Sequence, residues 1–477
     1  MSDLNRHVAM VLAHKDELFT LDRFAKVERA IGMLIETSLI DAPIGSVCYL
    51  EHEARQIPCE IVGFTQERCF LMALDSISGV QSGAWLKVPS GRAGEIGMAA
   101  PEALIGRVIS GLGEPLDGKG AIPGPRTVSV VHAINPMDRP PIDSILDTGV
   151  GVVNSLLTMG VGQRVGLFAG SGVGKSVFLG MLARHVQADA VVVGLVGERG
   201  REVAEFVDEV LGDGLSRSIV VASPADDSPA MRLRGARIAT ELAEQLARQG
   251  KQVLLLMDSL TRVAQAQREI GLAMGEPAAT KGYTPSSFAW LPRLVERAGR
   301  FSENGGSVTG FYTVLMEEDD LQDPVVDTAR AILDGHFVLS RDIAERGIYP
   351  AIDVSASVSR LMNKLAQPDQ LDKARRFRQL WHVYDEQQDL INVGAYRKGT
   401  DGEIDEAIDR FPAMCDFISQ GLMDKVVMND ALTRLDNLFQ SVTGQVGQGL
   451  TLDQEFGVSS VGTPLTEPGI PGGAGER

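Results

Sequence analysis

The chain has 477 residues, a formal net charge of −18 and 44% hydrophobic residues. This composition supplies a core and argues against nucleic acid as the main ligand, because phosphate backbones require a basic surface. Its cysteines, Cys48, Cys59, Cys69 and Cys415, lack Cys-x-x-Cys spacing, which argues against a zinc or redox pair and favours buried thiols in a reducing compartment. No apolar run reaches the roughly 20 residues that span a bilayer, and no signal core opens the chain. We therefore expect a cytoplasmic protein.

The N-terminal residues predict a helix followed by a small β-barrel. Apolar residues fall near helical spacing in residues 1–24, and this amphipathic helix either binds a partner or packs on its own domain. In residues 25–98, short β-rich runs alternate with Gly, Pro and Ser turns, as is typical of a small barrel. The runs are 47–50, 60–64, 69–73 and 84–88.

Residues 99–368 are predicted to form an α/β domain. Its first part, 101–140, is rich in glycine and proline and is interpreted as a connector. Strands and helices then alternate, which is typical of a mostly parallel sheet covered by helices. The strand candidates are 165–168, 190–196, 219–222, 253–257, 308–315 and 337–340, with a helix at 232–248. Residues 369–440 are predicted as a helical domain, and the Gly/Pro-rich residues 441–477 as a disordered tail.

A glycine loop inside the α/β domain predicts a phosphate site. Ala169-Gly-Ser-Gly-Val-Gly-Lys-Ser176 lies between a strand-like run and a helix-like run, which is the order that a P-loop requires. Glycines let backbone N–H groups surround an anion, and the helix N-terminus adds its positive dipole end. Lys175 is expected to bind the β- and γ-phosphates of ATP, and Ser176 a Mg²⁺ ion. The predicted ATP-binding residues are Ala169, Gly170, Ser171, Gly172, Val173, Gly174, Lys175, Ser176 and Val177, with Ala169 standing where the strict pattern has glycine.

Two acidic positions at strand ends are candidates for the hydrolytic step. Asp258 ends the apolar run 253–257, where a P-loop fold places a carboxylate near Mg²⁺. Glu198 follows the strand at 190–196, and the carboxyl ends of parallel strands are where ligands bind in such sheets. Glu198 is therefore either a base that polarises the attacking water or part of a salt-bridged turn.

These motifs resemble a known family. Gly197-Glu-Arg-Gly-Arg-Glu202 and Asp258-Ser-Leu-Thr-Arg262 resemble the catalytic beta subunit of rotary ATP synthases. Ala264-Gln-Ala-Gln-Arg-Glu-Ile-Gly-Leu-Ala-Met-Gly-Glu-Pro277 is more similar to type III secretion ATPases, as are 280–283, 294–299, 310–315, 332–336 and 349–353. Residues 390–399 resemble the flagellar export branch, although the injectisome branch shares much of this stretch. The resemblance covers residues 25–440 and implies a RecA-like P-loop ATPase core with an N-terminal β-barrel and a C-terminal helical domain.

The resemblance also implies a role for each site residue. Glu198 matches the general base, while Arg199 and Arg262 match groups near the γ-phosphate. Glu202 and Asp258 match the carboxylates that organise Mg²⁺, partly through water. Tyr349 matches the aromatic residue that stacks on adenine.

Arg360 has a different kind of role. In Ser357-Val-Ser-Arg360 it matches the arginine finger, which reaches into the site of a neighbouring subunit. Glu198 is of the catalytic-subunit type, whereas the Arg360 motif is of the companion alpha-subunit type. One chain thus carries both halves of an interfacial site, and a ring of identical subunits would have every interface competent.

The resemblance implies a cytoplasmic, Mg²⁺-dependent ATPase that forms a homohexamer at the inner-membrane export apparatus and energises flagellar protein export. The implied partners are a stator-like regulator on the N-terminal helix, a coiled-coil stalk protein at the central opening, export substrates and chaperones, and a membrane export gate. The segment 265–283 is expected to be a mobile loop near that opening. No nucleic-acid partner is expected.

Four other functions remain to be weighed. An injectisome ATPase would be the same enzyme in a different machine. An ATP synthase subunit is disfavoured because the acidic Asp-Glu-Leu-Ser-Glu-Glu-Asp run is missing, and a hexameric nucleic-acid translocase is disfavoured by the charge of −18. A platform that only binds nucleotide would not need Glu198 and Arg360 together with Lys175.

Overall fold

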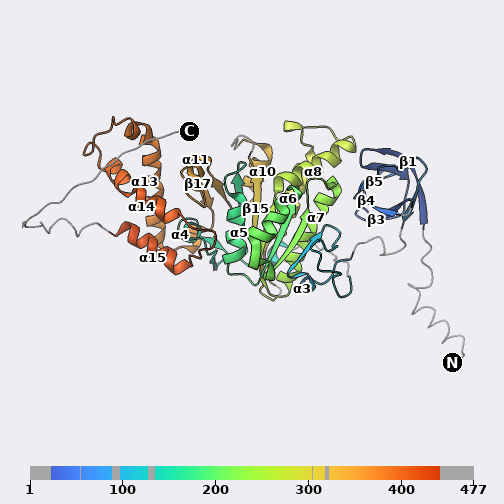
Figure 1. Cartoon of the computed structure of the whole chain (residues 1–477), viewed down its shortest axis with the longest axis horizontal. Helices are drawn as coiled ribbons and strands as arrows, with labels where there is room; N and C mark the ends of the chain where they lie inside the picture. Colours follow the sequence, from blue (N-terminus) through green and yellow to red (C-terminus); the bar gives the residue numbers. More distant parts are fainter. Residues whose placement is uncertain are drawn as a thin grey trace, which may run out of the picture. The chain divides into compact units, whose positions relative to one another are not determined.

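The computed structural model describes residues 23–53, 55–88, 97–126, 135–302, 304–316 and 322–440 (Figure 1). The predicted N-terminal helix lies outside these residues except for Arg23 and Phe24, which belong to the first strand. The predicted tail, 441–477, lies outside them entirely. Among the helices that the structure describes, none is long and apolar enough to cross a membrane.

The N-terminal part is a closed antiparallel barrel, as predicted. Its strands follow one another around the barrel in the order β1-β2-β5-β4-β3-β6. They are β1 (Arg23–Ile31), β2 (Leu34–Ser38), β3 (Val47–His52), β4 (Arg55–Phe64), β5 (Arg68–Ala73) and β6 (Trp85–Val88). In β4, Ile57, Cys59 and Ile61 alternate with less buried residues, which is the period of two that a barrel wall requires. The predicted strand runs fall on β3 to β6, whereas β1 and β2, which close the barrel, were not predicted.

The central part is the predicted α/β sheet, in the order β17-β16-β10-β15-β13-β11-β12-β7. Its neighbours are parallel except at β17, which runs antiparallel to β16. The strands are β7 (Arg107–Ser110), β10 (Arg164–Ala169), β11 (Ala190–Val196), β12 (Ser218–Ser223), β13 (Gln252–Asp258), β15 (Ser307–Leu315), β16 (Gly335–Leu339) and β17 (Ile352–Ser359), and the short β14 (Gly299–Arg300) pairs with β15. A separate two-stranded sheet consists of β8 (Ile145–Leu146) and β9 (Met159–Gly160).

One sequence interpretation is wrong in this region. The Gly/Pro-rich segment interpreted as a connector contains the short helix α3 (Pro101–Leu104) and the edge strand β7, which pairs with β12. Arg107 at the start of β7 binds Asp117 through two hydrogen bonds, of 2.7 and 2.9 Å. This pair folds the following glycine-rich turn back onto β7, so residues 107–117 form a strand and a turn of the sheet domain instead of a connector.

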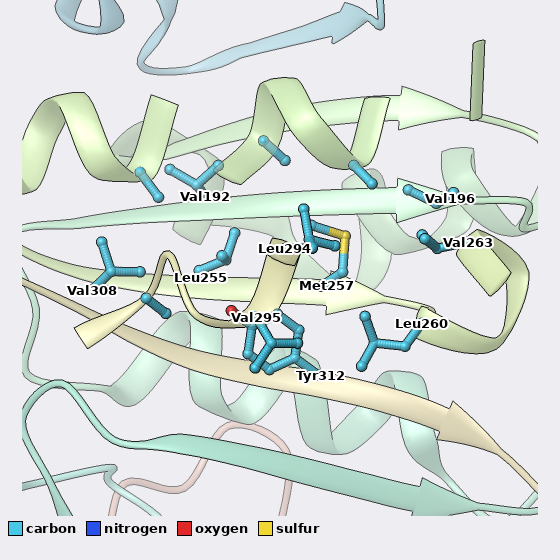
Figure 2. Packing of buried hydrophobic residues seen from close by; sticks show 14 of the residues in the cluster. Val192, Val196, Leu255, Met257, Leu260, Val263, Leu294, Val295, Val308 and Tyr312 are labelled. Atoms are coloured by element: carbon cyan, nitrogen blue, oxygen red, sulfur yellow. The ribbon is translucent and has the colours of Figure 1, made fainter. Parts of the chain in front are cut away.

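Helices cover both faces of the sheet and seal its core. The helical elements are η2 (Pro136–Asp138), α4 (Gly151–Leu156), α5 (Lys175–His185), α6 (Gly200–Glu205), η3 (Phe206–Leu211), η4 (Gly212–Arg217), α7 (Pro229–Arg248), α8 (Leu260–Ala273), η5 (Thr280–Gly282), α9 (Pro285–Val295), α10 (Pro324–Ile332), α11 (Arg341–Glu345) and α12 (Met362–Leu365). Figure 2 shows Val192, Leu255 and Tyr312 of neighbouring strands packing in one cluster with Val263 of α8 and Val295 of α9. Because these strands are buried on both faces, their sequences are continuous apolar runs in which apolar and polar residues do not alternate.

The C-terminal part is helical, as predicted. It consists of α13 (Pro368–Asn392), α14 (Gly402–Ile418) and α15 (Met428–Phe439). Aromatic side chains hold α13 and α14 together. Phe377 and Trp381 stack at 5.8 Å between ring centroids, and Phe417 of α14 packs against Phe377. Buried aromatic pairs of this kind add about 0.5–1.5 kcal/mol beyond their buried area.

Candidate active site

The glycine loop forms the floor of a cleft of about 1050 Å³ at the carboxyl ends of the strands. β10 ends at Ala169, and α5 begins at Lys175. Between them, Gly172 and Gly174 have φ angles of +80° and +90°, a left-handed backbone that favours glycine. The loop residues that line the cleft are Gly170, Ser171, Gly172, Gly174, Lys175, Ser176 and Val177. The N-terminus of α5 therefore opens into the cleft, which is the geometry of an anion site.

Lys175 is held between two carboxylates in this cleft. Its Nζ lies 2.9 Å from Oε1 of Glu198 and 2.7 Å from Oδ1 of Asp258. Burial lowers the pKa of Lys175, but Asp258 and Glu198 outweigh it, so the pKa is raised overall. The ammonium therefore remains charged at neutral pH.

The sheet register explains why these three groups meet. β11 and β13 are parallel neighbours, and Leu195 near the end of β11 pairs with Asp258, the last residue of β13. Glu198 lies two residues after the end of β11, so it is at the same carboxyl end of the sheet as Asp258. Parallel strands all end on the same side of the sheet, which brings residues that are far apart in the sequence close together in space.

Two arginines and Glu202 also line the cleft. Arg199 precedes α6 and pairs with Glu202 at 3.2 Å. Arg262, from the first turn of α8, donates from Nη1 to Gln265 at 2.9 Å. The Nε of Arg262 is buried and has no hydrogen-bond partner in the structure. Arg262 thus lines the cleft and has one buried donor that no described group satisfies.

Several predicted site residues do not form the cleft wall. Ala169 and Val173 of the loop are buried, and Asp258 is 2% exposed. Tyr349 lies beside the loop, and a Cβ atom at Gly174 would be 3.1 Å from its ring. Glycine at this position therefore allows the Tyr349 ring to approach the loop.

Arg360 lies at the end of the sheet opposite the cleft, where the parallel strands begin. It follows β17, whose last residue, Ser359, pairs with Gly335 at the amino end of β16. The cleft is at the carboxyl ends of the parallel strands, so the length of β16 separates the two. Arg360 Nη2 donates to the backbone oxygen of Arg330 at 2.9 Å, and its backbone N–H to that of Asp334 at 3.1 Å. The structure therefore does not bring Arg360 to the cleft of its own chain.

Sequence reasoning missed other residues that line the cleft. Thr261, Gln265 and Glu269 recur every four residues on α8, so they share one helix face. This spacing, directly after Asp258, was a signal that could have found them. Arg232 of α7 binds Glu269 at 2.9 and 3.0 Å, and Arg341 approaches the loop at Ser171. These two come from distant segments, and only the tertiary structure places them.

The expected mobile loop at 265–283 is wrong in its first half. Residues up to Ala273 continue α8 as a regular helix, and only the stretch after it is non-helical apart from the short η5. Glu276 is fixed within that stretch because it accepts hydrogen bonds from the backbone N–H and the hydroxyl of Ser286, at 2.8 and 2.6 Å. Glu276 therefore anchors the start of α9, whereas Met274 is 42% exposed.

Comparison with known proteins agrees with this architecture. Residues 149–359 match the model of the ATP synthase alpha/beta family, nucleotide-binding domain, and residues 366–437 match the T3SS EscN ATPase C-terminal domain. The chain is 49% identical over 433 residues to the flagellum-specific ATP synthase of Salmonella typhimurium, covering 88% of this chain and 94% of the relative. It is 52% identical over 416 residues to the flagellum-specific ATP synthase of Pseudomonas aeruginosa, covering 86% of this chain and 92% of the relative. It is 44% identical over 432 residues to the type 3 secretion system ATPase of Xanthomonas euvesicatoria, covering 88% of this chain and 93% of the relative.

Solved structures show the same likeness. The assembled ATPase EscN from the enteropathogenic E. coli type III secretion system matches with a TM-score of 0.80 and 39% identity, over 87% of this chain and 99% of that chain. EscN in complex with its central stalk EscO matches with a TM-score of 0.78 and 38% identity, over the same shares of the two chains. The fold expected from the motifs is therefore confirmed.

Proposed function

This chain belongs to the flagellum-specific and type III secretion ATPases of the ATP synthase alpha/beta family, and we propose that it hydrolyses ATP in this cleft to energise flagellar protein export. The observation that carries the proposal is the position of Lys175, at the N-terminus of α5 and between the carboxylates of Glu198 and Asp258. A cation, a helix N-terminus and a candidate base thus converge on one anion site.

Lys175 has two alternative sets of partners in this proposal. In the structure its ammonium neutralises two carboxylates. A bound triphosphate offers oxygens with more negative charge, and the backbone N–H groups of the loop fix those oxygens nearby. When Lys175 turns to the β- and γ-phosphates, Glu198 loses its cation and can accept a proton from the attacking water.

The remaining cleft residues supply charge and orientation. Arg262 and Arg199 line the cleft, and their guanidinium groups would stabilise the charge that develops on the γ-phosphate. The ring of Tyr349 lies beside Gly174, where it would stack on the adenine.

The donor set fits a Mg²⁺ ion that is shared with the nucleotide. In the part of the chain that the structure describes, no group of three or more His, Cys, Asp or Glu residues could hold a metal alone. Mg²⁺ commonly takes one or two protein ligands and completes its shell with phosphates and water. Ser176 would supply the direct oxygen, with Asp258 and Glu202 holding water ligands. The ion would neutralise charge on the phosphates.

Arg360 supports action across a subunit interface. Because it lies at the amino end of β16, it would serve the cleft of a neighbouring copy. The structure of assembled EscN supports a ring, which we propose to be a homohexamer in which each cleft is completed by the next subunit's Arg360. In related phosphoryl transfers such a finger contributes about 10³–10⁵ in rate.

The partners follow from the proposed export role. The EscN complex with its central stalk EscO supports a coiled-coil stalk protein in the ring opening. We further propose a stator-like regulator on residues 1–24, export substrates with their chaperones, and a membrane export gate, with the enzyme acting in the cytoplasm at the inner membrane. An injectisome ATPase is the second candidate, favoured by the EscN-type C-terminal match, whereas the Salmonella and Pseudomonas relatives favour the flagellar system.

Two measurements test the proposed function. The purified chain should release phosphate from ATP with Mg²⁺, and Lys175→Ala should retain less than a tenth of that turnover, since its ammonium is the group expected to bind the β- and γ-phosphates. The wild-type chain should restore filament growth in a strain that lacks its flagellar export ATPase but should not restore secretion in a strain that lacks its injectisome ATPase. The reverse pattern would assign the chain to the injectisome, and a folded Lys175→Ala protein with full turnover would refute the P-loop role.

A further inference from the structure

The carboxyl end of β15 connects two parts of the cleft lining, the glycine loop and the first turn of α8. β15 lies between β10, which leads into the glycine loop, and β13, which ends at Asp258. Met316 N–H donates to the Ala169 carbonyl oxygen at 3.0 Å, at the entry to the loop. Leu315 N–H donates to Thr261 Oγ1 at 2.9 Å, in the first turn of α8. The end of β15 therefore fixes the glycine loop relative to the segment that follows Asp258.

Thr313 adds a side-chain contact to the same region. It is 0% exposed, and its hydroxyl donates to Oδ1 of Asp258 at 2.6 Å. The same carboxylate oxygen accepts from Lys175 Nζ at 2.7 Å. The proposed mechanism assigns no role to Thr313.

We propose that Thr313 is a positioning residue for ATP hydrolysis, which holds the Asp258 carboxylate in place when Lys175 moves to the nucleotide. This inference rests on the proposed function. A carboxylate that is 2% exposed is costly to leave without a donor. Lys175 supplies one of its hydrogen bonds in the structure, and the proposed mechanism takes that bond away. The hydroxyl of Thr313 remains, because its residue is fixed in the middle of the sheet.

The chemistry of threonine suits this task. Its hydroxyl donates a hydrogen bond without adding a charge, so it does not compete with Lys175 or with Mg²⁺ for the carboxylate. The β-branched side chain has few accessible χ1 rotamers in a strand, so the position of its Oγ1 is well defined. Of the two acceptors within reach, Asp258 Oδ1 at 2.6 Å is nearer than the Met257 backbone oxygen at 3.3 Å. Asp258 would thus keep one orientation toward the water ligands of the ion through the catalytic cycle.

A second buried threonine on the same strand provides a matched control. Thr309 is 3% exposed, and its Oγ1 accepts a hydrogen bond from Gly162 N–H at 2.8 Å. It lies four residues before Thr313, about 13 Å away along a strand, toward the edge of the sheet opposite the cleft. Thr309→Val removes a buried hydroxyl from β15 without touching Asp258.

The test compares Thr313→Val, Thr313→Ser and Thr309→Val in the full chain. A hydrogen bond to a charged group is worth about 1.5–3 kcal/mol, so Thr313→Val should lower kcat by about 10- to 100-fold. The affinity for a fluorescent ATP analogue without Mg²⁺ should change less than threefold. When Mg²⁺ is then titrated into the complex with the analogue, the Mg²⁺ concentration that gives half of the fluorescence change should rise about tenfold. Thr313→Ser keeps the hydroxyl and should restore both values to within threefold of the wild type.

Thr309→Val should lower the thermal midpoint but leave kcat per folded subunit unchanged. If Thr313→Val does not fold, Thr313→Ala removes the same hydroxyl with less crowding and takes its place in the comparison. A valine or alanine variant with wild-type kcat and Mg²⁺ dependence would overturn the proposal, as would a serine variant as impaired as valine. Absence of turnover in the wild-type chain would instead refute the proposed function.

Discussion

Replacing Glu198 by glutamine separates nucleotide binding from hydrolysis. The amide has nearly the shape of the carboxylate, and its oxygen can still accept from Lys175 Nζ, which lies 2.9 Å away. Lys175 also retains Asp258 at 2.7 Å, and the backbone oxygen of Glu198 still accepts from Ala225 N–H at 2.9 Å. The change therefore leaves the turn after β11 in place and removes the basic group.

The expected effect of Glu198→Gln is large on turnover and small on binding. A general base contributes about 10²–10⁴-fold, so kcat should fall by about that factor, equivalent to about 2.7–5.4 kcal/mol in the barrier. Affinity for ATP should be unchanged or higher, because one negative charge near the γ-phosphate is lost. Phosphate release measures the first quantity and titration with a fluorescent ATP analogue the second.

Glu205→Gln is the matched control for this prediction. Glu205 is on α6, close in sequence to Glu198, and pairs with Arg201 on an exposed surface at 2.6 Å. Exposed pairs of this kind contribute about 0–1 kcal/mol, so this variant should keep its turnover. If Glu198→Gln loses binding and turnover together, Glu198 belongs to a salt-bridged turn and the assignment of the base is refuted.

Three further predictions concern the interface, the stalk and the sheet edge. Arg360→Ala and Lys175→Ala subunits should each lack ATPase activity, but a mixture should regain part of it, because some interfaces then join an intact loop to an intact finger. Met274→Ala should keep basal turnover and lose stimulation by the stalk protein, since its exposed side chain follows α8 directly. Asp117→Asn should lower the free energy of unfolding at pH 7 by about 1.5–3 kcal/mol, because Asp117 accepts two hydrogen bonds from Arg107.

The last of these predictions also has a pH dependence. The hydrogen bond from Arg107 holds the pKa of Asp117 below its usual range. A lowered pKa in the folded state stabilises the protein above the unfolded-state pKa of about 3.9, and this contribution disappears as the pH falls. Urea unfolding of the wild type and Asp117→Asn should therefore differ by a constant amount from pH 7 down to about pH 4, and this difference should shrink as the pH falls further toward the lowered pKa of Asp117 in the folded state. A difference that does not shrink below about pH 4 would refute the role of the ion pair.

The grouped predictions have equally definite contrary outcomes. Robust turnover by Arg360→Ala alone would remove the finger role, and a mixture that stays inactive would argue against action across the interface. Stimulation that survives Met274→Ala would exclude this residue as a contact for the stalk.

Local sequence patterns determined the parts of this protein that depend on neighbouring residues. The loop from Ala169 to Ser176 is specified by its own glycines and by the strand and helix on either side. Asp258 was identifiable because it ends a continuous apolar run. These signals need no knowledge of distant contacts, since phosphate binding uses consecutive backbone N–H groups and one helix terminus.

Pairings between distant segments were decided only by the tertiary structure. β7 has a glycine-rich context, and its pairing with β12 makes it a strand. The non-helical signals Gly271 and Gly275 suggested a loop, but α8 continues through Gly271 to Ala273, where Ile270 packs in a buried cluster with Met231 of α7. Packing of this kind overrides the cost of about 1 kcal/mol that glycine carries in a helix.

In the site, too, the sequence identified single residues, whereas the tertiary structure decided which of them meet. The sequence alone named Lys175, Glu198 and Asp258, but the register of β11 and β13 brings the two carboxylates to one ammonium. The antiparallel direction of β17 puts Arg360 at the end of the sheet where the parallel strands begin, away from the cleft. The order of the strands brings the Thr313 hydroxyl within hydrogen-bond distance of Asp258. Strand order, direction and register depend on which segments pair across the whole domain, so no local window of sequence contains them.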